Sequence, residues 1–73
     1  MTVNRIRFGA ELKRRRLAAG LSQVALAERS GTTPNSIARM ERGERGPSLS
    51  MAQALALALR CKVDDLLSKG GKR

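Results

Sequence analysis

The stretch from Gly20 to Ser48 reads GLSQVALAERSGTTPNSIARMERGERGPS, and it holds two short helix-forming segments on either side of a turn. Ser22 and Thr33 each precede a run of helix-forming residues, which is the usual position of an N-cap. Pro34 follows Thr33, and proline is tolerated at the first helical position because the N–H group there lacks a helical partner. The turn at residues 30–33, Ser-Gly-Thr-Thr, is short and contains a glycine. This pattern is typical of a helix-turn-helix motif.

Three further segments outside this stretch also have helical character. The segment before Gly20 carries side chains at helical spacing, namely Phe8, Leu12, Arg16 and Ala19. Residues 54–59 alternate alanine and leucine as a strand would, but both are strong helix formers and alanine is depleted in strands. Either Ser48 or Ser50 can cap that helix. We therefore expect an all-α fold of five helices, over residues 5–19, 23–29, 34–42, 49–59 and 63–67.

The length and charge of the chain limit the range of functions it can have. Its 73 residues form one domain at most, with a core over residues 5–68 and a flexible basic tail at 69–73. A chain this short buries only about 60% of its unfolded surface, which leaves little room for a deep active-site cavity. Fifteen Lys and Arg against six Asp and Glu give a net charge of +9. Such a charge attracts polyanions, so nucleic acid is the first expected partner and an anionic membrane surface the second.

The composition also excludes several classes of site. There is no histidine to serve as a metal ligand or general base, and one cysteine forms neither an internal disulfide nor a cysteine-rich zinc site. Phe8 is the single aromatic residue, which argues against a stacking platform for single-stranded RNA. No run of about 20 apolar residues and no signal peptide is present. We expect a cytoplasmic protein that is not an enzyme and binds no metal, cofactor or small molecule.

The second helix of the motif has one apolar face and one polar face. Ile37 and Met40 lie three residues apart and can pack against the preceding helix. The opposite face then presents side chains suited to a ligand: Pro34, Asn35, Ala38 and Arg39, with Ser36 at the edge. A helix of nine residues is roughly 13 Å long, comparable with a major groove about 12 Å wide. In that groove asparagine suits adenine and arginine suits guanine.

These residues together resemble the lambda-repressor-like helix-turn-helix family, also called the Xre or Cro/CI family. The match rests on the following elements: Gly20-Leu21-Ser22-Gln23, Leu26-Ala27-Glu28-Arg29, Gly31, Ile37, Glu41-Arg42-Gly43 and Pro47-Ser48. It covers nearly the whole chain, from Phe8 to Leu67. The resemblance implies a five-helix domain, usually dimeric, that regulates transcription from operator DNA. Small members act as phage-type repressors, antitoxins or restriction–modification controllers; the short stand-alone architecture favours the controller type.

The resemblance also implies roles for individual residues. Base reading would fall to Thr33, Pro34, Asn35, Ser36 and Arg39, with Asn35 and Arg39 as the principal readers, because Thr33 and Pro34 are also explained as the start of a helix. Phosphate contacts would come from Gln23, Arg16, Arg42 and Arg45, and from the N–H groups around Gly43–Gly46. Arg16 and Glu41 would form a semi-buried ion pair that orients the recognition helix.

The sequence also indicates a candidate assembly surface and protein partners. Leu57 points about 100–200° away from Leu55 and Leu59 on a helical projection, and with Val63 and Leu67 it forms a candidate homodimer patch. The alternative is that all of these residues complete the core. A second functional class is an antitoxin or adaptor that binds a protein, such as a toxin or RNA polymerase, and contacts DNA weakly. Arg60, where the family commonly has a helix-ending glycine, must adopt a left-handed conformation or end the helix otherwise.

Overall fold

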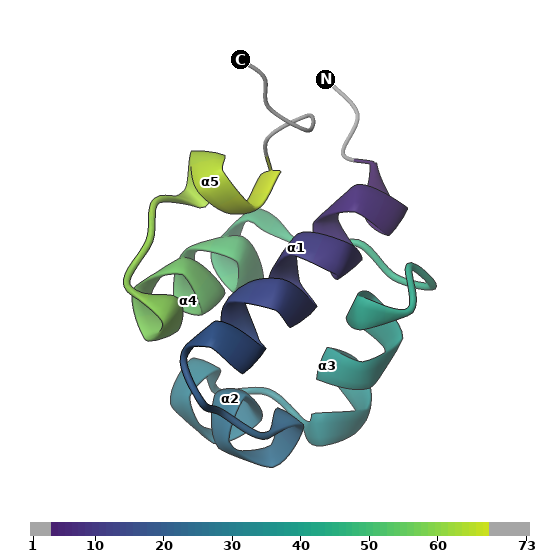
Figure 1. Cartoon of the computed structure of the whole chain (residues 1–73). Helices are drawn as coiled ribbons and strands as arrows, with labels where there is room; N and C mark the ends of the chain where they lie inside the picture. Colours follow the sequence, from purple (N-terminus) through teal and green to yellow (C-terminus); the bar gives the residue numbers. More distant parts are fainter. Residues whose placement is uncertain (1–3, 68–73) are drawn as a thin grey trace.

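The computed structural model describes residues 4–67, which form five α-helices joined by short connections (Figure 1). They are α1 (Arg5–Ala18), α2 (Gln23–Ser30), α3 (Pro34–Glu41), α4 (Leu49–Leu59) and α5 (Val63–Leu67). This confirms the predicted all-α, five-helix fold, and the alternating Ala-Leu segment is helical. Within this range no helix is long and apolar enough to cross a membrane. The predicted basic tail at 69–73 lies outside the described residues.

The helix boundaries follow from local capping. The hydroxyls of Ser22, Thr33 and Ser48 accept hydrogen bonds from backbone N–H groups three residues later, at 3.0–3.1 Å. Ser48 rather than Ser50 is therefore the cap of α4. Asn4 caps α1 by accepting from two N–H groups, both at 3.1 Å, and the sequence analysis did not identify this cap.

Two helices end one residue earlier than predicted, and α2 ends one residue later. Ala19 and Arg42 are the C-caps of α1 and α3, so neither belongs to its helix. The recognition helix is therefore Pro34–Glu41. In α2, Ser30 extends the helix because its hydroxyl donates to the Leu26 carbonyl at 2.6 Å, which satisfies a buried polar group.

Arg60 ends α4 in the left-handed conformation, with φ of 56°. Among the described residues no other non-glycine residue has a positive φ. A left-handed residue with a side chain costs about 1–2 kcal/mol, and here two backbone hydrogen bonds offset it. The N–H group of Arg60 bonds the Leu57 carbonyl at 3.2 Å, and that of Cys61 bonds the Ala56 carbonyl at 2.9 Å. At the start of α5, Asp65 accepts from the N–H group of Lys62 at 3.0 Å.

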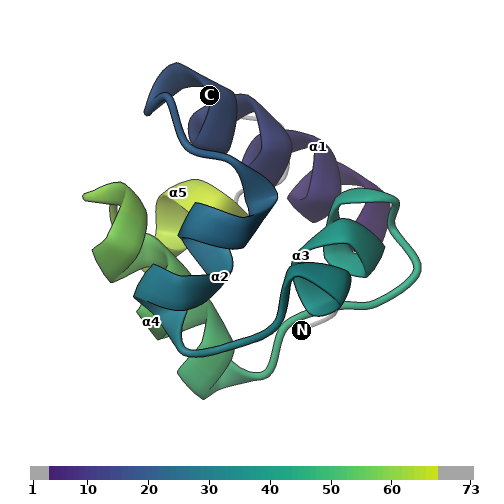
Figure 2. The ribbon, with the colours of Figure 1, turned by 90° about the horizontal axis from the view of Figure 1, so that it is seen from below.

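The five helices close into a ring around one core. α1 packs against α3 and α5, α2 packs against α3 and α4, and α4 packs against α5 (Figures 1 and 2). Each helix contributes at least one buried apolar side chain to a single cluster. These are Phe8, Leu12, Leu26, Ala27, Ile37, Met40, Leu55, Ala56 and Leu66. The ring leaves one face of α3 at the molecular surface.

Gly9 sets the distance between α1 and α3. A Cβ atom at this position would lie 2.3 Å from the carbonyl oxygen of Met40 and 2.8 Å from that of Glu41. Both atoms are backbone atoms, so no side-chain rearrangement would relieve the contact. Glycine in a helix interior is normally unfavourable, and its presence here allows α1 to approach the end of α3 closely. The role of Gly9 was not predicted from the sequence, although a glycine inside a helical segment can indicate a close packing contact.

Candidate nucleic-acid interface

The helix-turn-helix motif consists of α2, the turn after it, and α3 (Figure 2). Gly31 closes α2 with φ of 76°, and the next N–H group, of Thr32, bonds the Ala27 carbonyl at 2.9 Å. Leu26 and Ala27 on α2 and Ile37 and Met40 on α3 belong to the same core cluster, and each is at most 1% exposed. The inner face of α3 is thus the face that sequence analysis predicted.

The outer face of α3 is accessible. Pro34, Asn35 and Arg39 are exposed, and Ser36 is half-buried at the edge. Thr33 is exposed, but its hydroxyl is already used: it accepts from the Ser36 N–H group and donates to the Ser36 hydroxyl, both at 3.1 Å. The structure therefore leaves four of the five predicted base readers exposed at α3, with Ser36 half-buried, and Thr33 has a capping role of its own.

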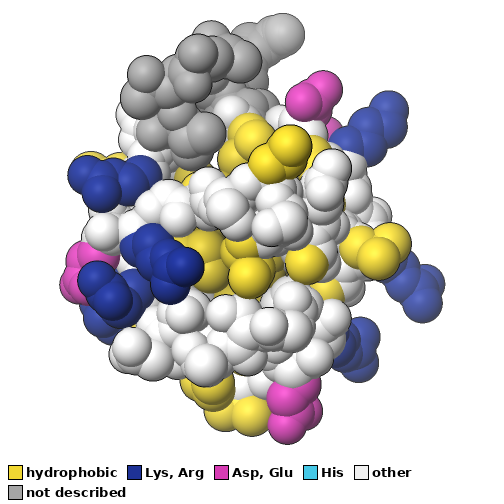
Figure 3. Space-filling model, turned by 180° about the vertical axis from the view of Figure 1, so that it is seen from behind, with side chains coloured by type: hydrophobic (Ala, Val, Ile, Leu, Met, Phe, Trp, Pro, Cys, Tyr) yellow, Lys and Arg dark blue, Asp and Glu magenta, His cyan; other side chains and the backbone are white. Residues whose placement is uncertain are grey.

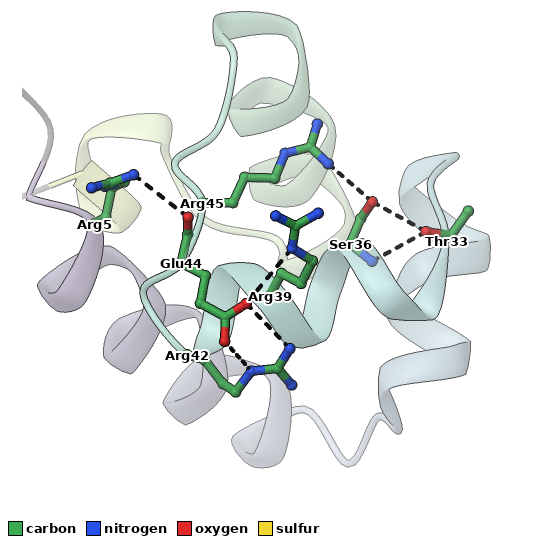
Figure 4. A network of polar contacts seen from close by, with 7 residues as sticks. All are labelled: Arg5, Thr33, Ser36, Arg39, Arg42, Glu44 and Arg45. Atoms are coloured by element: carbon green, nitrogen blue, oxygen red, sulfur yellow. Dashed lines mark hydrogen bonds and ion pairs between the residues drawn. The ribbon is translucent and has the colours of Figure 1, made fainter.

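The connection after α3 reaches back over this outer face (Figure 4). Arg45 donates from Nη1 to the Ser36 hydroxyl at 3.1 Å. Glu44 accepts from Nε of Arg42 at 2.7 Å, and its other carboxylate oxygen lies 3.7 Å from Nε of Arg39. The Glu44 carbonyl also accepts from Arg5 of α1 at 3.5 Å. Sequence analysis predicted Arg42 and Arg45 in this region but not the carboxylate between the arginines.

A second polar network lies at the junction of α1, α2 and α3. The Arg16 side chain donates from Nε and Nη2 to the two carboxylate oxygens of Glu41, at 2.6 and 3.1 Å, and from Nη1 to the Leu21 carbonyl at 2.8 Å. Only 9% of the Arg16 side chain and 4% of the Glu41 side chain are exposed. Gln23 donates to the same carboxylate at 3.1 Å. The predicted ion pair is present, and it also fixes the Gln23 side chain at the start of α2.

Figure 3 shows Lys and Arg side chains close together on the side of α3 and the connection after it, and others spread along the opposite edge. The exposed arginines there are Arg5, Arg39, Arg42 and Arg45. Glu44 is the carboxylate among them. A hydrogen bond from Arg42 lowers the pKa of Glu44 below its usual value, and the positive charges of Arg42 and Arg39 lower it further. Glu44 is therefore ionised at neutral pH.

The remaining predicted residues lie away from this surface. Leu57 on α4 is 81% exposed, whereas Val63 and Leu67 are half-buried and pack against the core cluster. The structure thus leaves Leu57 as an outward-facing apolar side chain and gives Val63 and Leu67 a share in the core. Within residues 4–67, no three His, Cys, Asp or Glu side chains come together as metal ligands.

Comparison with known proteins finds this arrangement in DNA-binding regulators. A family model described as helix-turn-helix matches residues 12–66. An uncharacterised HTH-type transcriptional regulator from Methanothermobacter thermautotrophicus is 39% identical over 56 residues, which is 75% of this chain and 81% of that protein.

Two solved structures are similar over most of both chains. The restriction–modification controller protein C.AhdI from Aeromonas hydrophila is 38% identical, with a TM-score of 0.83, and the match covers 86% of this chain and 91% of that one. The P22 c2 repressor, crystallised in complex with a synthetic operator, is 33% identical, with a TM-score of 0.81 and coverage of 84% and 92%.

Proposed function

Because the chain belongs to the helix-turn-helix family of DNA-binding transcriptional regulators, we propose that it recognises a specific duplex sequence by placing α3 in the major groove. The family is one of regulators and not of enzymes. The observation that carries the proposal is the division of α3 into a buried face, with Ile37 and Met40, and an exposed face, with Asn35 and Arg39. An eight-residue helix is about 12 Å long and fits a groove about 12 Å wide.

Asn35 and Arg39 are the proposed base readers. Both are exposed, and they lie four residues apart, so they project from the same side of α3. No hydrogen bond within residues 4–67 uses the guanidinium of Arg39, whose nearest ion-pair partner, Glu44, lies beside Nε. Its two terminal nitrogens point away from Glu44 (Figure 4). That geometry suits a bidentate contact with guanine O6 and N7.

The proposed phosphate contacts flank α3 on both sides. Gln23 begins α2, where N–H groups without helical partners favour an anion. Arg42 and Arg45 follow α3 and are exposed. Arg16 is nearly buried, so its principal role is to hold Glu41 and Gln23 in place. These contacts would position the helix without reading the sequence.

Binding of duplex DNA is tested by fluorescence anisotropy over a range of salt concentrations. If the protein neutralises six or more phosphates, affinity falls by about 10³-fold or more between 50 and 200 mM salt, because bound counterions are released. An affinity that does not change with salt would contradict DNA binding as the function.

The proposal includes a homodimer that binds two half-sites about 34 Å apart, as a repressor or controller of its own operator. Leu57 supports this, since an exposed leucine gains by burial against a second copy. Sedimentation of Leu57→Glu is expected to show a shift toward monomer, whereas Leu17→Glu, at a 58% exposed leucine on α1, leaves the association unchanged. A monomeric wild-type protein that also lacks sequence preference would favour the adaptor or antitoxin alternative.

A further inference from the structure

We infer that Glu44 is a specificity-determining residue, which positions Arg39 for base reading and weakens binding to duplexes that lack the correct base pair. The inference rests on the proposed function and assigns a role to a carboxylate inside the basic surface. A negative charge at this place is unexpected, because it repels the phosphates that the neighbouring arginines attract.

The backbone places Glu44 directly over Arg39. Gly43 has φ of 79°, and its N–H group bonds the Met40 carbonyl at 3.1 Å. The N–H group of Glu44 bonds the Arg39 carbonyl at 3.0 Å. This pair of bonds is the Schellman motif, in which the side chains of the second residue after the cap and of the third residue before it come into contact. That contact is usually hydrophobic, and here it is the ion pair between Glu44 and Arg39.

The direction of the contact keeps Arg39 available for a base. Glu44 lies 3.7 Å from Nε, on the side of the guanidinium opposite the two terminal nitrogens (Figure 4). An arginine held through Nε loses rotational freedom before it meets DNA, and a pre-ordered side chain loses less entropy on binding. Arg39 can therefore contact guanine without leaving Glu44.

The same carboxylate penalises binding that uses phosphates alone. Glu44 also pairs with Arg42, with Nε–Oε2 and Nη2–Oε1 distances of 2.7 and 3.4 Å. A phosphate that recruits Arg42 must compete with Glu44, whereas the base contact of Arg39 uses terminal nitrogens that Glu44 leaves free. Non-specific affinity comes from phosphate contacts, so Glu44 lowers it more than it lowers specific affinity.

The test compares Glu44→Gln with Glu28→Gln. Glu28 is an exposed carboxylate on α2 without an ion pair in residues 4–67, so the control makes the same change in net charge. The probes are the duplex selected by the wild-type protein, the same duplex with one changed guanine pair, and a scrambled duplex. Glu44→Gln is expected to bind the scrambled duplex several-fold tighter and to lose about tenfold of the discrimination at one guanine pair. Glu28→Gln should change all three affinities by similar factors.

A double-mutant cycle separates positioning from a structural role. In an Arg39→Ala background, Glu44→Gln should cause no further loss of base discrimination, because the residue through which Glu44 acts is absent. The thermal stability of Glu44→Gln should stay near that of the wild type, since exposed ion pairs contribute little.

Two results would overturn the inference. One is wild-type discrimination in Glu44→Gln, and the other is an equal loss in the presence and absence of Arg39. A wild-type protein that selects no duplex would instead overturn the proposed function, and the inference with it.

Discussion

At the scale of single residues, Arg39 combines an exposed position on α3 with two terminal nitrogens that no hydrogen bond within residues 4–67 uses. Replacing Arg39 with alanine should cost about 1–3 kcal/mol of discrimination at one base pair and leave the other positions of the site unaffected.

Gln23→Ala should weaken binding to all duplexes alike, because a phosphate contact carries no sequence information. Competition between single-base variants of one duplex measures both effects. An unchanged base preference in Arg39→Ala would show that α3 is not oriented in the groove as proposed.

Cys61 offers a pH-dependent prediction at the same scale. Partial burial raises the pKa of its thiol above the usual value, and the positive charge of Arg15 offsets only part of that effect. Iodoacetamide should therefore react more slowly with the folded protein than with the urea-unfolded chain. The increase of the reaction rate with pH should occur at a higher pH in the folded protein than in the unfolded chain. Because the folded pKa is raised, the associated stability is present below the unfolded pKa and is lost as the pH rises through the folded pKa. If the reaction rate of the folded protein increases at a lower pH than that of the unfolded chain, the raised pKa of Cys61 would be contradicted.

The roles of several residues were predictable because they depend on local hydrogen bonds. Ser22 and Thr33 have the predicted capping roles because each depends on atoms within a few residues in the chain. The position of Glu44 was not predicted, although Gly43 before it is a signal for the Schellman motif. The contact with Arg39 depends on backbone geometry that composition and spacing do not reveal.

At the scale of elements, the contact of α1 with α3 depends on Gly9. Gly9→Ala should destabilise the fold, because overpacking costs about 1–3 kcal/mol and alanine regains only about 1 kcal/mol in helix propensity. Affinity for DNA should also fall, since the end of α3 must move away from α1. Thermal unfolding measures the first effect and anisotropy the second. Gly46→Ala is the control, because its Cβ atom would meet only the flexible Arg5 side chain, at 3.2 Å. Equal stability of the two variants would contradict the steric argument.

The junction of α1, α2 and α3 is held by the pair of Arg16 and Glu41. Glu41→Leu should cost about 3–5 kcal/mol, because it leaves a buried guanidinium without its partner. Total stability for 73 residues is about 4–11 kcal/mol, so this variant is expected to be marginal. Adding Arg16→Met should restore part of the loss by removing the unpaired charge. Urea unfolding of the two variants measures the difference, and a double variant less stable than Glu41→Leu would contradict the explanation.

Helix positions were more predictable than helix contacts. The sequence predicted all five helices to within one residue at each end, because helix propensity, caps and glycines act locally. The close approach at Gly9 and the sharing of Glu41 between Arg16 and Gln23 are tertiary features. The pattern of residues along the sequence does not specify which faces of two helices pack together, or at what distance. The resemblance to a family supplied the Arg16–Glu41 pair, and periodicity alone did not.

At the scale of the whole molecule, the fold separates two surfaces. The arginines around α3 form one, and the exposed Leu57 lies on α4, a helix that packs mainly against α2 and α5. The proposed surface for DNA and the proposed surface for a second copy therefore lie on different helices, and both could be used at the same time. The charge of +9 predicted a polyanion as partner, and the arginines around α3 are the proposed place of contact.

The most direct test of sequence recognition by α3 is selection from a random duplex pool at about 150 mM salt, near physiological ionic strength. The expected result is an enriched site of two inverted half-sites about one helical turn apart, with an adenine and a guanine at the positions facing Asn35 and Arg39. Repeating the selection with Arg39→Ala should remove the preference at the guanine alone. Recovery of no enriched sequence by the wild-type protein would contradict the proposed function.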